Sequence, residues 1–241
     1  MSSIAASVST NNWPGMSTGK QSLVYTGLQG LLDEGSLFIA SSVPGTAIAT
    51  TTSVVDDAAT QSSTHAQASP VMLLQNQNVA GSNYNVYPIY LKMNIIQVPT
   101  SATLWKYAIR LDPLSTKLTT AGTVITPQNL NANQTNNSKC YVTFGAITTV
   151  IASGQSRLVG NGLVSGAIPV ANDQWYIAFG QVASSPDSIG TQTLVKSLTI
   201  PVPPIVIPPT WFMTLEMWGT SNAAAPSWDF EFVYAERPAG Q

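Results

Sequence analysis

The clearest alternating pattern in the chain is Trp228-Asp-Phe-Glu-Phe-Val-Tyr234. Aromatic residues occupy every second position, and the carboxylates Asp229 and Glu231 stand between them. Successive side chains of a β-strand point to opposite faces of a sheet, so this spacing predicts a strand with one apolar face and one polar face. An amphipathic helix would instead place apolar residues three or four positions apart.

The same two-residue period recurs along the chain from residue 71 onward. It is found in Ile89/Leu91/Met93/Ile95, Trp105/Tyr107/Ile109/Leu111, Trp175/Ile177/Phe179 and Leu194/Leu198. Residues 141–151 and 211–218 are apolar at nearly every position, as expected for strands covered on both faces. Turn-forming residues separate these runs, and the spacing predicts about eight strands in an antiparallel sandwich or barrel.

The first 65 residues have a different composition, rich in Ser, Thr, Ala, Asn and Gly. Such a segment is typical of a loop or an extended arm that orders only against another surface. One part, residues 21–34, carries leucines at helical spacing, namely Leu23, Leu28, Leu31 and Leu32. We therefore expect an N-terminal arm with a short helix over residues 1–65 and a β-sandwich domain over residues 66–241.

Charge is scarce in this chain. Its 241 residues include nine Lys or Arg and eleven Asp or Glu, so 8% are charged, whereas about a quarter is usual. Charged side chains are depleted at the cores of protein–protein interfaces because their desolvation is costly, so the composition predicts a surface covered largely by neighbouring molecules. Lys20 is the only Lys or Arg among the first 91 residues, which argues against an arm that neutralises nucleic-acid phosphates.

The sequence also bears on compartment and membrane. No run of 18 apolar residues occurs, and the most apolar stretch, 200–209, is interrupted by prolines, so we expect no transmembrane segment. The N-terminus has neither a basic n-region nor an apolar h-region, which predicts no cleaved signal and folding in a cytoplasm. The single cysteine, Cys140, cannot form an intrachain disulfide, and we expect it to be a small buried hydrophobe.

A glycine-rich segment, Leu158-Val-Gly-Asn-Gly-Leu-Val-Ser-Gly166, superficially resembles a phosphate-binding loop. Its spacing does not match a dinucleotide fingerprint, and the residues after it indicate a strand where such a loop would need a helix N-terminus. Asn161-Gly162 between two apolar runs instead predicts the turn of a β-hairpin.

Few residues are candidates for catalysis or metal binding. His65 is the only histidine, which excludes a multi-histidine metal site within one chain, and a Ser-His-Asp triad unless this residue takes part. Asp56-Asp57 and the Asp229/Glu231 pair are the only groupings of carboxylates that could bind a hard cation or act as acid and base. If Glu216 lies on an adjacent strand, Asp229 and Glu231 could join it in a calcium site or a glycosidase-like active site. The simpler interpretation of such a pair is the solvated face of an edge strand. We predict no catalytic, cofactor or metal site.

The tryptophans divide into two groups. Trp105, Trp175 and Trp228 fall on the apolar parity of predicted strands and are expected in the core. Trp13 lies in the arm, where it would either anchor in a pocket of a neighbouring molecule or staple the arm to its own chain.

An uncharged arm followed by about eight strands resembles the jelly-roll coat proteins of small icosahedral viruses, particularly virion structural proteins of tailless bacteriophages. The segments that carry the resemblance are Val86-Tyr-Pro-Ile-Tyr-Leu-Lys-Met93, residues 157–169, Pro203-Pro-Ile-Val-Ile-Pro-Pro209 and residues 228–238. They span roughly the last two thirds of the chain. Many RNA-virus coats differ in having an Arg-rich arm, which this chain lacks.

The resemblance implies an eight-stranded jelly roll that is not an enzyme and needs no cofactor. Such a chain would be the structural subunit of an icosahedral capsid, assembling through its arm, loops and sheet edges to enclose the genome. Its partners would be many copies of itself, with other virion proteins, and only weak or indirect contact with viral nucleic acid. It would be located in the virion, after assembly in the host cytoplasm.

An alternative function is a receptor- or carbohydrate-binding β-sandwich, as in a virion spike or a lectin. Its binding residues would be Trp218 and the loop 219–227, where an exposed aromatic ring can stack on a sugar. A glycoside-cleaving enzyme is a third hypothesis, for which the chain offers no convincing acid/base pair.

Overall fold

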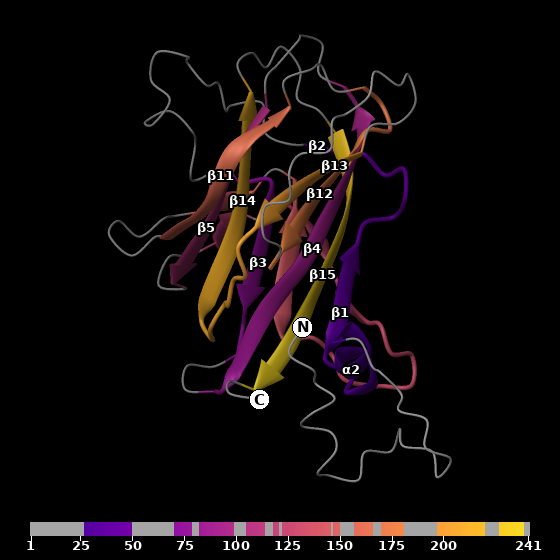
Figure 1. Ribbon diagram of the computed structural model, residues 1–241, viewed down its shortest axis with the longest axis vertical. Helices are drawn as coiled ribbons and strands as arrows, with labels where there is room; N and C mark the ends of the chain where they lie inside the picture. Colours follow the sequence, from indigo (N-terminus) through magenta and orange to yellow (C-terminus); the bar gives the residue numbers. More distant parts are fainter. Residues whose placement is uncertain are drawn as a thin grey trace.

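The computed structural model describes residues 27–49, 70–78, 82–98, 105–113, 118–120, 122–145, 147–149, 157–165, 170–180, 197–219 and 227–238. This part of the chain is all-β apart from one helix, α2 (Gly27–Asp33). Two sheets lie face to face in a sandwich-like arrangement, with β5, β11 and β14 in one layer and β4, β15 and β1 in the other (Figure 1).

The first sheet, sheet A, has seven strands. Six of them follow the order β13 (Ser197–Val202), β12 (Gln174–Phe179), β4 (Tyr84–Gln97), β15 (Ser227–Pro238), β1 (Leu37–Ser41) and β8 (Gln128–Asn129). The seventh, β2 (Ile48–Ala49), pairs with the start of β15. Neighbouring strands are antiparallel except β12 and β13, which run parallel.

The second sheet, sheet B, has six strands, and all neighbours are antiparallel. Their order is β11 (Arg157–Ser165), β5 (Trp105–Pro113), β14 (Trp211–Gly219), β3 (Met72–Asn76), β9 (Cys140–Phe144) and β7 (Thr123–Ile125). A separate pair consists of β6 (Leu118–Thr120) and β10 (Thr148–Thr149).

The expected count of eight strands is not confirmed, because the described residues contain fifteen. Several of the additional strands are only two or three residues long. A strand of that length is too short to show a two-residue period, so its sequence carries no recognisable pattern. The all-β prediction itself is confirmed.

β15 is the centre of sheet A and forms much of the core. Its aromatic residues Trp228, Phe230, Phe232 and Tyr234 are all buried, as the alternation predicts. Trp228 contacts Trp175 of β12 with ring centroids 4.9 Å apart, so two of the three tryptophans expected in the core are there. The side chain of Trp105, the third, lies outside the described residues.

β4 departs from the predicted alternation at one point. Leu91, Met93 and Ile95 are buried in the core, but Ile89 is half-buried against the opposite, outer face of sheet A. The register against β15 explains this, because Val233 pairs with Tyr90 whereas Tyr234 pairs with Pro88, leaving one extra residue in β4. Such a bulge reverses the parity of a strand, and a regular pattern cannot anticipate it.

Part of the predicted arm belongs to the sandwich. Residues 37–41 form β1, which pairs with β15 over five residues. The helix expected within residues 21–34 is seen over Gly27–Asp33, where Leu31 and Leu32 pack against Leu37 and the outer face of β15. Leu28 does not share this contact face and is 51% exposed.

The hairpin prediction at Asn161-Gly162 is wrong. Residues 157–165 form one strand, β11, in which Asn161 pairs with Ala108 and Gly162 with Tyr107. Pairing along β5 supplies backbone partners over the whole segment, and this tertiary contact outweighs the local preference of Asn-Gly for a turn.

The prediction for residues 211–218 is confirmed, since β14 is buried on both faces from Phe212 to Met217. Met213, Leu215 and Met217 face the core. On the outer face, Phe212 packs with Leu73 and with Ile147, which follows β9. The segment between β5 and β11 therefore covers part of the outer face of sheet B.

Candidate functional site

Several residues singled out from the sequence lie outside the described part of the chain. These are Trp13, Asp56, Asp57 and His65. Trp218 lies at the end of β14, but its side chain and residues 220–226 of the following loop are also outside it. The hypotheses that rest on them stay predictions.

Asp229 and Glu231 share the outer face of sheet A, as the alternation indicates, and both have partners within the protein. Asp229 accepts hydrogen bonds from the Gly45 amide, at 3.2 Å, and from the Asn94 side chain. Glu231 accepts one from the Tyr90 hydroxyl at 2.5 Å, and burial together with this bond raises the Tyr90 pKa. These contacts give both carboxylates a structural role.

Glu216 does not join that pair. It lies in sheet B, where its carboxylate is 3.2 Å from Nε of Arg110 on β5. The expectation of an adjacent strand is therefore wrong: β14 and β15 belong to different sheets. In the part of the chain that the structure describes, no three His, Cys, Asp or Glu side chains gather as they would around a metal ion.

Cys140 is buried at the start of β9, as expected. Burial raises the pKa of its thiol well above the ordinary value of 9.0, and the nearby Glu236 carboxylate raises it further. The thiolate is the nucleophilic form of cysteine, so a thiol held protonated and covered is unreactive.

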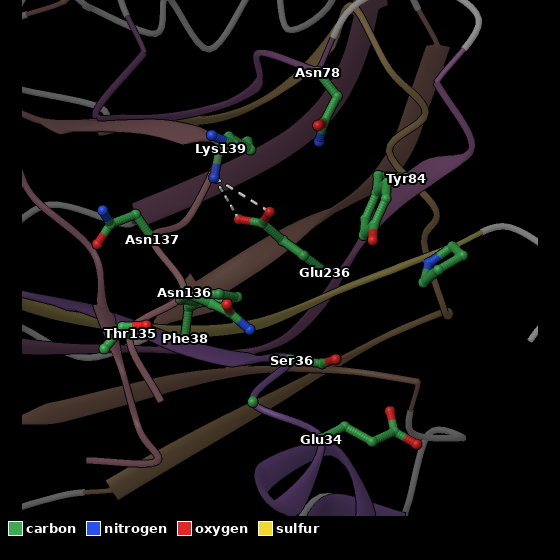
Figure 2. A pocket seen from close by; sticks show the side chains of 12 residues that line it. Glu34, Ser36, Phe38, Asn78, Tyr84, Thr135, Asn136, Asn137, Lys139 and Glu236 are labelled. Atoms are coloured by element: carbon green, nitrogen blue, oxygen red, sulfur yellow. Dashed lines mark hydrogen bonds between the residues drawn. The ribbon is translucent and has the colours of Figure 1, made fainter. Parts of the chain in front are cut away.

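A cleft lies at one end of the sandwich. It has a volume of about 560 Å³ and is formed by four segments that are distant in sequence. They are residues 34–38, Asn78 after β3 with Tyr84 at the start of β4, residues 135–139, and the end of β15 with Glu236 and Pro238 (Figure 2).

The first wall of the cleft is positioned by the end of α2. Gly35 donates to the Leu32 carbonyl and Ser36 to the Leu31 carbonyl, the bonds of a Schellman cap, with Gly35 at a φ of +70°. A side chain at residue 35 would also collide with Gln134, since a Cβ would lie 2.6 Å from its Cγ. Glycine is therefore required here by both conformation and space.

The second wall is held by asparagine side chains just before it in sequence. Asn129 donates to the Gly35 carbonyl at 2.8 Å and Asn131 to the Leu32 carbonyl at 3.0 Å. These bonds join the segment between β5 and β11 to the end of α2. They fix the approach to residues 135–139, which follow directly.

The carboxylate of Glu236 stands at the inner end of the cleft and is 7% exposed. It accepts hydrogen bonds from the Ser138 hydroxyl and from the Lys139 amide, at 3.1 and 3.2 Å to its two oxygens (Figure 2). Ser138 is hydrogen-bonded in turn to the Tyr234 hydroxyl at 2.6 Å and accepts from the Cys140 amide. Burial raises the Tyr234 pKa, so this hydroxyl stays protonated.

The remaining charges of the cleft nearly balance. Two carboxylates, those of Glu34 and Glu236, line the cleft. The Glu34 carboxylate lies 3.3 Å from Nε of Arg237, whose positive charge compensates it. Lys139 also lines the cleft and adds one ammonium group, and the other polar side chains of the lining are uncharged amides and hydroxyls. The arrangement thus favours hydrogen bonding over the attraction of a strongly charged ligand.

Sequence reasoning missed this cleft because no local motif encodes it. The run from Asn129 to Asn137 reads only as turn chemistry, and its clustered amides were the one available signal. Glu236 looks like an ordinary strand residue until Ser138 and Lys139, which directly precede β9, are brought against it.

Comparisons of the chain with models of protein families, with curated proteins and with solved structures gave no match. Among the described residues, no helix has the length and apolar character needed to cross a membrane. Any function must therefore be argued from the fold and the surface themselves.

Proposed function

We propose that the protein is a structural subunit of an icosahedral viral capsid that assembles with many copies of itself to enclose a genome. The copies join through the arm, the loops and the edges of the two sheets. The alternative, a receptor- or carbohydrate-binding sandwich built around Trp218, stays a prediction because that side chain lies outside the described residues.

The observation that carries the proposal is the order of the eight principal strands. In chain order they are β1, β3, β4, β5, β11, β12, β14 and β15, and we letter them B to I. Sheet A then contains the order B-I-D-G and sheet B the order C-H-E-F. Neighbours within these two sets are antiparallel. This order supports a jelly roll, an architecture found in viral capsid and lectin domains.

The other strands are additions at the margins of this arrangement. β13 and β8 extend sheet A, and β9 with β7 extends sheet B beyond β3. Of the seven other strands among the described residues, five, β6 to β10, come from the long connection between β5 and β11. Wider sheets give each subunit more edge and surface for contact with neighbours.

The scarcity of charge is the second support. A capsid subunit buries much of its surface a second time during assembly, and uncharged hydroxyls and amides can enter an interface without the cost of desolvating ions. With nine basic and eleven acidic residues in 241, the chain has few ions to desolvate.

The test is assembly of the purified full-length chain. Light scattering after size exclusion and negative-stain electron microscopy should show closed particles of uniform diameter. A strictly monomeric protein at high concentration, with no particles under varied salt and pH, would refute the proposal.

Two matched substitutions examine the role of sheet edges. Leu158 lies on β11, at the edge of sheet B, and is 47% exposed. Leu158→Lys should lower the yield of particles by placing a charge at a contact edge, while Leu158→Thr, which leaves the same position uncharged, should have a smaller effect. Equal effects would argue against edge contacts.

A further inference from the structure

The cleft lined by Glu236 and Tyr84 has the dimensions of a ligand site. Its volume of about 560 Å³ falls within the range of small-molecule pockets, roughly 300–1,000 Å³. The assembly proposal assigns no ligand to this concavity.

Neutral hydrogen-bonding groups dominate the lining. Asn78, Asn136 and Asn137 contribute amides and Thr135 a hydroxyl to the lining (Figure 2). The Asn78 side chain is oriented by its own bond, in which its Nδ2 donates to Oδ1 of Asn76 at 2.8 Å. An amide offers both a donor and an acceptor, so these groups suit a ligand that carries both.

Glu236 adds a buried carboxylate at the inner end of the cleft. Its oxygens share the Lys139 amide, and Oε1 also accepts from Ser138. A carboxylate has about four acceptor positions, so the shared N–H leaves acceptor capacity on Oε2. Because Ser138 and the backbone hold the group in place, a ligand that uses it need not order it first.

Apolar surface completes the lining. The Tyr84 ring is 47% exposed at the side of the cleft, and Phe38 and Pro238 also line it. An aromatic ring with one face open can pack against a partly apolar ligand.

The charges give no preference for an ionic ligand. Glu34 is paired with Arg237, and Lys139 balances the second carboxylate, Glu236, so the lining offers no excess positive charge to hold a phosphate or another anion. Among the described residues no group of three acidic, His or Cys side chains can hold a metal ion. A neutral ligand with many hydroxyls and an apolar C–H face meets every feature.

We propose that this cleft binds a saccharide, with Glu236 and the asparagine amides hydrogen-bonding its hydroxyls and Tyr84 packing on its ring. This goes beyond the assembly proposal and does not depend on it. The site is distinct from Trp218 and the loop after it, at which the sequence hypothesis placed sugar binding.

The experiment uses the full-length protein on a glycan array, followed by saturation-transfer NMR with the free saccharides that score. We expect at least one glycan class to bind, with a Kd of about 1 mM or tighter. Glu236→Gln should weaken that binding about tenfold, because it replaces a charge-assisted bond. Tyr84→Ala should weaken it severalfold. Glu231→Gln, the same change on the outer face of sheet A, should leave it unaltered.

Glu236 is buried, so its variant must first give the wild-type circular dichroism spectrum. If it does not fold, Tyr84→Ala and Asn137→Ala, both at exposed positions, decide the question. Absence of any glycan signal from the wild type would overturn the inference, as would wild-type binding by the cleft variants or equal loss in Glu231→Gln. Particles seen in the same samples without glycan binding would leave the assembly proposal standing while this one fails.

Discussion

Replacing Phe144 and Phe230 by leucine, singly and together, tests whether the segment between β5 and β11 is part of the core. Phe144 closes β9 in sheet B, and Phe230 lies at the centre of sheet A. Their rings stack with centroids 4.4 Å apart and planes inclined by 10°. The stacked pair thus connects β9 of sheet B with β15 of sheet A.

The magnitudes follow from burial and stacking. Both side chains are at most 2% exposed, and we expect each single change to lower the free energy of unfolding by about 1–2 kcal/mol. A stacked aromatic pair contributes about 0.5–1.5 kcal/mol beyond the area it buries. The double variant should therefore be less destabilised than the sum of the single variants by roughly 1 kcal/mol. A domain with about 5–15 kcal/mol of stability remains folded under this loss.

The assay is urea unfolding followed by tryptophan fluorescence, at concentrations below assembly because association would add to the apparent stability. Val202→Ala combined with Phe144→Leu is the control. Val202, on β13 of sheet A, lies beside Gly160 of β11. β11 is one edge strand of sheet B, and β9 lies next to the strand at the other edge. That pair should be additive within about 0.3–0.5 kcal/mol. If the changes at Phe144 and Phe230 are additive within the same range, the stacking of the two rings is refuted.

Three further predictions concern other parts of the sandwich. The thiol of Cys140 has a pKa raised by burial, so the folded state holds its proton above pH 9.0 while the unfolded chain loses it. Stability should then fall by about 1.4 kcal/mol per pH unit above that value, and Cys140→Ala should reduce the slope in urea titrations between pH 8 and 10. Gly122→Ala should lower the melting temperature by several degrees, because the new Cβ would lie 2.3 Å from the Phe144 carbonyl oxygen; an unchanged melting curve would contradict that geometry. Arg110→Ala removes the guanidinium beside Glu216, which is 2% exposed, and should cost about 3 kcal/mol in chemical denaturation; Arg110→Lys should restore part of the loss.

Alternation identified several of the strands that build the core, but not β1, whose buried Phe38 and Ala40 fall in the predicted arm. In β15 and β12 every aromatic residue expected inside is inside, because residues of one parity point to the same face of a strand. The pattern failed at Ile89, where a bulge adds a residue to β4, and at Asn161-Gly162, where pairing with β5 replaces a turn.

The cleft could not be predicted in the same way. Its carboxylate, Glu236, and the groups that hold it, Ser138 and Lys139, are about 100 residues apart in sequence. The alternation does place Glu236 on the face of Tyr234 and Glu231 on the opposite face, where it meets Tyr90. It does not indicate what Glu236 contacts, because Ser138 and Lys139 reach it only through the tertiary structure.

By itself, the sequence determined the all-β class, the inward face of the long strands and the scarcity of charge. These properties depend on composition and on the period of two, both of which are local. The tertiary structure alone decided which strands are neighbours, that part of the predicted arm completes sheet A, and where Glu236 meets Ser138. Strand order and site geometry arise from contacts between distant segments, and a local pattern contains no information about its partner.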